Sequence, residues 1–128
     1  MNKLGSTADL LERVRARQAR YDERAYLFVL ASIEYIQGRL PARRHVSGRE
    51  LSHACRDYAL EQYGLLARTV LEHWGVRATE DFGRIVYALV DAGLLVTKPG
   101  DRVEDFHEVY RFDRAFERGY VWQGIPGN

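Results

Sequence analysis

The segment from Lys98 to Glu108 concentrates side chains that can bind a cation or transfer a proton. Five of them lie within a short span: Asp101, Glu104, Asp105, His107 and Glu108. Carboxylates and imidazoles are ligands for divalent metals, but neither the EF-hand spacing nor the H-E-x-x-H pattern is present. A metal site in a small metal-dependent hydrolase is one interpretation of this loop, and a solvated loop tip is the simpler one. We predict no metal site and no cofactor.

Arginines gather in the N-terminal half of the chain, where their guanidinium groups suit phosphate or carboxylate partners. Residues 1–64 carry 11 basic and 8 acidic side chains. The connector "GRLPARRHVSGR" contains Arg39, Arg43, Arg44 and Arg49, and a second set, Arg13, Arg17, Arg20 and Arg24, follows helical spacing. A solvated helix face and a polar loop are the simpler interpretations of the two sets. The connector is the better candidate for binding DNA or RNA.

The sequence contains no pattern typical of a catalytic centre. P-loop, G-x-G-x-x-G and G-x-S-x-G motifs are all absent. His53 and Cys55 are two residues apart, so on a helix they point in different directions and do not form a zinc site. Cys55 lies on an apolar stripe, which favours a small core residue over a nucleophile. We therefore predict that the chain is not an enzyme and has no catalytic residues.

The distribution of charge along the chain separates the two classes of partner. The whole chain has a net charge of +1, whereas residues 78–113 carry four basic and eight acidic side chains. Such a segment repels phosphate, but it suits a basic protein face. We predict that a protein partner contacts Glu80, Asp81, Arg84, Arg102, Glu104 and Asp105. Nucleic-acid binding through the connector is the alternative.

Composition bounds the setting of these residues. A chain of 128 residues with 46% hydrophobic and 29% charged residues is expected to fold as one domain with one core. No stretch approaches the roughly 20 apolar residues of a membrane span, and the start "MNKLGSTADL" lacks a signal-peptide pattern. With Cys55 as the single cysteine, we expect a cytoplasmic protein. The sequence predicts no particular oligomeric state.

The periodicity of apolar residues predicts the elements that position these side chains. Helices are expected over residues 8–20, 22–37, 47–64, 65–74 and 79–93. Ser47 and Glu50 match the capping-box pattern, and Thr79 is a predicted N-cap. Strands are expected at "LLVT" and "VYRF", with Val103 and Phe106 anchoring the loop between them and one helical turn following from Asp113.

The order of these elements resembles a known fold. Three helices followed by strand, long loop and strand over residues 47–112 are similar to a winged helix-turn-helix, with residues 6–38 as an added N-terminal helical layer and 113–128 as a loose tail. The predicted class is mainly α with a small β-hairpin. The segments "RRHVSGREL", "LARTVLEHWGVRATEDFGRIVYALVDAGLL" and "EDFHEVYRF" also resemble a family of small uncharacterised bacterial proteins, best known from planctomycete and verrucomicrobial genomes. That family has no assigned activity, so the resemblance implies no catalytic residues. A non-enzymatic regulatory or interaction module is the predicted function.

Overall fold

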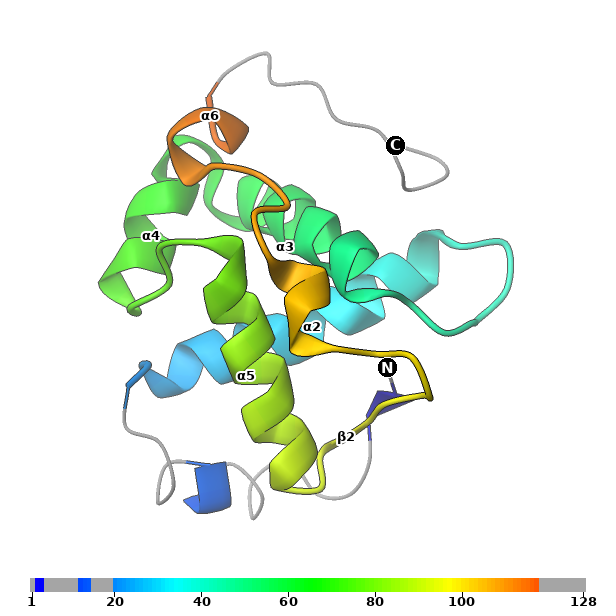
Figure 1. The fold of residues 1–128 in the computed structure, drawn as a ribbon. Coiled ribbons are helices and arrows are strands. Elements are labelled where there is room, and N and C mark those ends of the chain that lie inside the picture. The colour runs from blue at the N-terminus through cyan, green and yellow to red at the C-terminus, as the bar shows by residue number, and fades with distance from the viewer. Residues whose placement is uncertain (1, 4–11, 15–19, 118–128) are drawn as a thin grey trace.

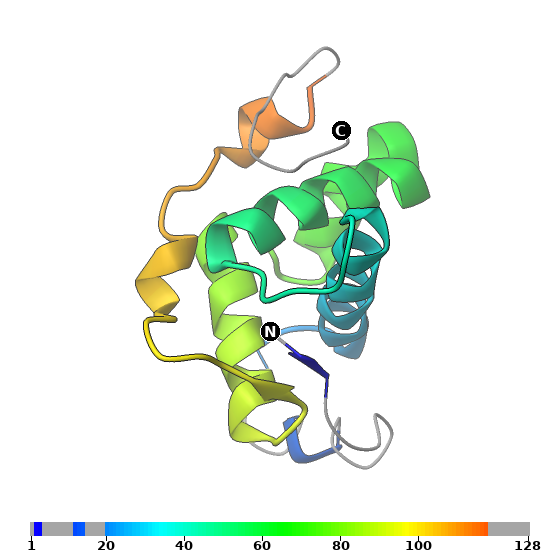
Figure 2. The ribbon, with the colours of Figure 1, turned by 90° about the vertical axis from the view of Figure 1, so that its right-hand side faces the viewer.

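The protein is mainly helical, as the sequence predicts. The computed structural model describes residues 2–3, 12–14 and 20–117. The longer helices are α2 (Glu23–Arg39), α3 (Gly48–Tyr63), α4 (Ala67–His73) and α5 (Thr79–Asp91). The short elements are β1 (Asn2–Lys3), η1 (Gly64–Leu66), β2 (Leu95–Val96), η2 (Val103–Phe106) and α6 (Phe112–Ala115). Helix α2 lies behind α3 and α5 in Figure 1, and Figure 2 shows η2 on the opposite side of α5 from α2.

Helix α2 is the central buried helix. The side chain of Asp22 caps its start by accepting from the backbone N–H of Arg24 at 2.9 Å. The predicted apolar stripe is confirmed, because all five of its residues are buried: Tyr26, Val29, Leu30, Ile33 and Ile36. Leu27, which the sequence pattern adds to this face, instead points to solvent.

Helices α3 and α5 begin in different ways. The capping box predicted for α3 is present: Ser47 Oγ accepts from Glu50 N and Glu50 Oε1 accepts from Ser47 N, each at 3.1 Å. Thr79 is not the cap of α5, so that prediction is wrong. Its hydroxyl turns inward and donates to the carbonyl of Phe106 at 2.7 Å, while Asp81 Oδ2 accepts from Ala78 N at 3.1 Å. The first residue of α5 is therefore hydrogen-bonded to Phe106, the last residue of η2.

The predicted β-hairpin is not formed among the described residues. Strand β2 pairs antiparallel with β1, with Asn2 opposite Val96, and the segment "VYRF" forms no strand. Tyr110 and Phe112 are both buried, and Tyr110 donates to the carbonyl of Ser52 at 2.6 Å. Burial of these rings against the helices draws the segment away from β2 and into the one-turn helix α6, close to the predicted helical turn.

Phe106 fixes the loop between β2 and α6 to the helices. Its ring is fully buried, and it lies against the backbone of Gly48 in α3 and of Gly83 in α5. A Cβ at Gly48 would lie 2.8 Å from the ring, and one at Gly83 would lie 3.0 Å from it. Anchoring by Phe106 in a helical turn agrees with the prediction, whereas Val103 is 45% exposed. Both glycines are required because only a missing side chain leaves room for this ring.

Some predictions lie outside the described residues. They concern most of the helix at 8–20, including Arg17, and the tail from 118 onwards, including Trp122.

The connector after α2 has no strand at His45 and Val46; it is held by Gln37, whose Nε2 donates to the carbonyl of Arg44 at 2.6 Å. No helix in the described part of the chain has both the length and the apolar character needed to cross a membrane.

Candidate functional site

Two adjacent hollows lie where the start of α5 meets the segment running from η2 to α6. The η2 hollow has a volume of about 320 Å³ and is lined by Glu80, Arg84, Val103, Glu104 and His107. The α6 hollow has a volume of about 680 Å³ and is lined by Arg68, Arg77, Ala78, Glu80, Glu108, Tyr110, Arg111, Phe112 and Asp113. Glu80 lines both, so the two hollows lie side by side and together make up the candidate site.

Three of the six residues predicted to contact a protein partner meet in the η2 hollow. These are Glu80, Arg84 and Glu104. Arg102 and Asp105 belong to the same loop but do not line the hollow; Asp105 Oδ2 accepts from the backbone N–H of Arg102 at 3.0 Å and so holds the start of η2.

Asp81 is a structural residue instead of a contact residue. It is buried, and its Oδ2 accepts from the backbone N–H groups of Arg77 and Ala78. Its Oδ1 accepts from the Tyr21 hydroxyl and from Arg84 Nη1, the latter at 2.8 Å. Burial, together with the hydrogen bond to Asp81, raises the pKa of Tyr21 to about 12, so the phenol remains a donor at neutral pH. The carboxylate of Asp81 and Nη1 of Arg84 therefore already have hydrogen-bond partners within the chain.

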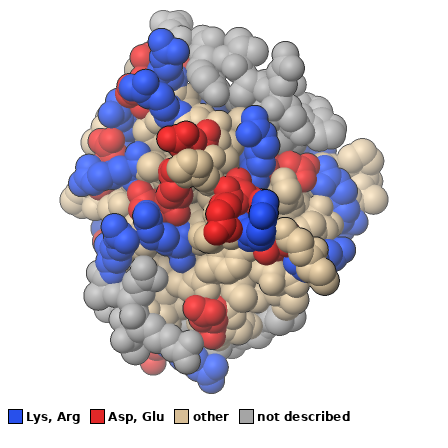
Figure 3. Space-filling view, viewed as in Figure 1, with Lys and Arg blue, Asp and Glu red and all other residues tan. Residues whose placement is uncertain are grey.

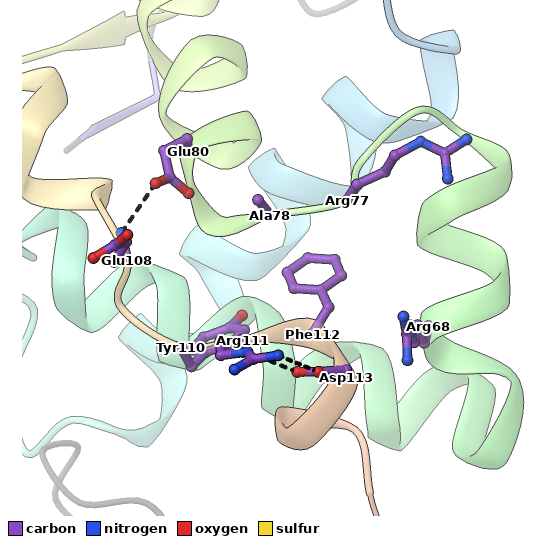
Figure 4. Close-up of a pocket in the computed structure, with 9 residues that line it drawn as sticks. All are labelled: Arg68, Arg77, Ala78, Glu80, Glu108, Tyr110, Arg111, Phe112 and Asp113. Carbon is purple, nitrogen blue, oxygen red and sulfur yellow. Dashed lines mark hydrogen bonds and ion pairs between the residues drawn. The ribbon is translucent and has the colours of Figure 1, made fainter.

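Glu80 holds the backbone that separates the two hollows. Its Oε2 accepts from the backbone N–H of Glu108 at 3.2 Å and lies 3.0 Å from Nδ1 of His107. Glu108 has a φ of +43°, the one positive φ of a non-glycine residue in the described part of the chain. This left-handed conformation is costly for a residue with a Cβ and is maintained here by the bond to Glu80. As a result the Glu108 side chain projects at the rim of the α6 hollow, as Figure 4 shows.

The α6 hollow has a buried aromatic side and basic groups from α4 and the α4–α5 connector. Figure 4 shows Phe112 pointing toward Ala78, with Arg68 and Arg77 on the α4 side and Glu80 and Glu108 on the other. Arg68 Nε donates to Glu72 at 3.0 Å. No ion pair or side-chain hydrogen bond of Arg77 is found within the described residues. Among the described residues, Arg77 is therefore the one cation lining this hollow that has no charged partner.

Sequence reasoning missed the α6 hollow. The residues that line it come from three separate stretches of the sequence, at 68, 77–80 and 108–113, and the short turn "GVRA" that carries Arg77 gives no functional signal by itself. Tyr110 and Phe112 lie in "VYRF", for which the sequence predicts a strand, and a strand pattern gives no sign of this hollow.

The connector arginines do not form a free basic patch. Arg39 pairs with Glu61 at 3.4 Å, Arg43 with Glu34 at 3.4 Å, and Arg44 with Glu50 at 2.6 Å. Arg49 is exposed and has no ion pair within the described part of the chain. Figure 3 shows basic and acidic side chains interspersed over the face that it presents. The local field available for phosphate is therefore weaker than the count of arginines suggests.

The remaining chemical candidates are buried in α3. Burial raises the pKa of the Cys55 thiol to about 12, so the nucleophilic thiolate is absent at neutral pH, in keeping with the predicted core role. Burial, with Arg49 and Arg56 nearby, lowers the pKa of His53 to about 4. Within the described residues, no three side chains of the His, Cys, Asp and Glu types gather as a metal site.

In comparisons with family models, with curated proteins and with solved structures, nothing matches this chain. Its resemblance to the family of small bacterial proteins stays a prediction.

Proposed function

We propose that the chain is a non-enzymatic interaction module that binds a segment of a protein partner across the η2 and α6 hollows. The observation that supports this proposal is the convergence of three predicted contact residues with an exposed apolar side chain, Val103, around one hollow. A concave surface with an apolar centre and a few polar groups suits a peptide segment better than it suits a phosphate backbone.

Two free charges would select the partner's sequence. Glu104 is exposed, and none of its side-chain atoms is in an ion pair within the described residues. Arg77 has the same property at the far side of the α6 hollow. The partner segment would carry a basic side chain facing Glu104 and an acidic side chain facing Arg77, with apolar side chains between them. Such complementarity determines specificity and association rate more than total affinity.

The winged-helix interpretation of residues 47–112 is part of this proposal. The succession of α3, α4 and α5, with α5 leading into β2, supports it. In our proposal the segment that would form the wing, from η2 to α6, is held against α3 and α5 by Phe106 and serves as one wall of the binding site. We also propose that the fold belongs with the small bacterial family that the sequence resembles.

The experiment is affinity capture of partners from a lysate of the source cell, with quantitative mass spectrometry, using Glu104→Lys and Arg77→Glu. Each variant reverses one free charge, and we expect each to reduce recovery of the same nuclease-resistant protein about tenfold or more. Glu34→Lys is the matched control, because it makes the same charge change on α2, far along the chain from the hollows. Equal recovery by all four proteins would refute the assignment of this surface. Complete loss of partners after nuclease treatment would favour nucleic-acid binding instead.

A further inference from the structure

A second exposed surface, unrelated to the two hollows, lies where α3 ends. Leu65 is 89% exposed, Leu66 is 63% exposed and the neighbouring Tyr63 is 36% exposed. Leu27 of α2, 42% exposed, belongs to the same region because it lines a hollow together with Tyr63. We call these four residues the η1 patch. Contiguous large apolar side chains on a surface are typical of an interface with another macromolecule.

The exposure of the two leucines follows from how α3 ends. Gly64 has φ 54° and ψ −128°, a conformation essentially restricted to glycine, and its N–H donates to the carbonyl of Leu60. The chain then makes the single 3-10 turn η1 before Ala67 returns to the core. Gly64 thus sets the direction in which Leu65 and Leu66 protrude.

An apolar hollow of about 240 Å³ shares Leu27 and Tyr63 with the η1 patch. It is lined by Arg24, Leu27, Phe28, Ala31, Tyr58, Tyr63 and Trp74. Its aromatic rings pack on one another, with centroids 5.5 Å apart for Phe28 and Tyr58 and 5.8 Å apart for Tyr63 and Trp74. This interlocked wall gives the hollow a defined shape.

The charge of the hollow argues against an acidic or nucleic-acid occupant. Of the described residues lining it, Arg24 alone is charged, and its Nε and Nη2 donate to the two carboxylate oxygens of Asp22 at 3.0 and 3.1 Å. An electrically neutral rim neither attracts phosphate nor repels a second copy of the same rim.

We propose that the η1 patch is a self-association surface, in which Leu65 and Leu66 of one copy enter the apolar hollow of a second copy. A twofold dimer requires a patch that is complementary to itself. Leu65 and Leu66 follow closely after Tyr63, and Tyr63 lines the hollow, so protrusion and hollow belong to one patch; in the proposed dimer the leucines of each copy enter the hollow of the other. None of the four patch residues lines the η2 hollow or the α6 hollow.

Sedimentation velocity of the full chain, from about 1 µM to about 1 mM, tests this dimer. We expect a concentration-dependent dimer whose Kd rises at least about 100-fold in Leu65→Glu, because the twofold axis buries this side chain twice. Ala31→Trp, which fills the hollow while leaving both leucines in place, should have a similar effect. Val96→Glu is the matched control, since Val96 is an exposed apolar residue outside the patch.

Three results would overturn the dimer: a monomer over the whole range, a dimer insensitive to both Leu65→Glu and Ala31→Trp, or equal weakening by Val96→Glu. Circular dichroism and the Tm show that each variant is folded, and Leu65→Glu should be well tolerated because Leu65 is almost fully exposed. The result is independent of the proposed partner site, because capture through Glu104 and Arg77 uses other residues.

Discussion

Replacing Gly83 by alanine tests whether the close contact of Phe106 with α5 determines where the binding loop lies. A Cβ at Gly83 would be 3.0 Å from Cβ, Cγ and Cδ2 of Phe106, inside ordinary van der Waals contact. The ring has no room to retreat, because it is fully buried and Gly48 confines it from α3. Overpacking of this kind costs about 1 to 3 kcal/mol.

Alanine at a helical position also contributes about 1 kcal/mol of helix propensity relative to glycine. For Gly83→Ala in the natural chain these two effects oppose each other, and we expect a net loss of up to about 2 kcal/mol in the free energy of unfolding. In a Phe106→Ala background the close contacts with Cγ and Cδ2 are removed and only the contact with Cβ remains, so most of the overpacking is relieved and the propensity gain outweighs the rest. Gly83→Ala should then stabilise the protein by up to about 1 kcal/mol.

The assay is urea unfolding of the four proteins of this double-mutant cycle, with a coupling energy of about 1 to 3 kcal/mol expected between Gly83 and Phe106. Phe106→Ala by itself should cost about 3 to 5 kcal/mol. Gly38→Ala is the matched control: it is also on a helix, and its Cβ would meet nothing within 4 Å. If Gly83→Ala has the same effect in both backgrounds, or stabilises the natural chain as Gly38→Ala should, the contact does not determine the position of the loop.

Three further predictions concern other features of the structure. The pKa of His53 is lowered to about 4 in the folded chain. Between about pH 6.5 and 4 the unfolded chain therefore binds a proton at this residue that the folded chain does not. The free energy of unfolding should consequently fall by roughly 2 kcal/mol as the pH drops from 7 to 4.5. His53→Phe should reduce this loss in urea unfolding at the two pH values, and an unchanged loss would show that His53 is not its source. Asp81→Ala should lower the free energy of unfolding by about 2 to 4 kcal/mol, because the backbone N–H groups before α5 and the Tyr21 hydroxyl lose their acceptor. Glu104→Ala should leave the free energy of unfolding almost unchanged. Similar costs for the two variants would contradict their assigned roles. Since three connector arginines are paired with carboxylates, fluorescence titration with duplex DNA and with RNA at low salt should show little binding, and a log–log salt slope of about −3 or steeper would contradict this.

Local patterns in the sequence predicted the helices well. The period of Tyr26, Val29 and Ile33 identifies the buried face of α2, and Ser47 with Glu50 identifies the start of α3, because both signals depend on residues within one or two helical turns. Thr79 shows the limit of such signals. Its hydroxyl had a local role available as a cap, but it bonds the carbonyl of Phe106, 27 residues away.

The sequence by itself determined the class of the protein: mainly helical, with its apolar faces, its α3 cap and an acidic segment at 78–113. Only the tertiary structure decided which of the acidic side chains are free to contact a partner. Asp81 and Asp105 bind backbone N–H groups, Glu80 holds Glu108, and Glu104 remains in solvent, although sequence alone treats all four alike. The physical reason is that a carboxylate's role depends on the donors brought to it, and here donors such as Tyr21 and Glu108 come from distant parts of the chain.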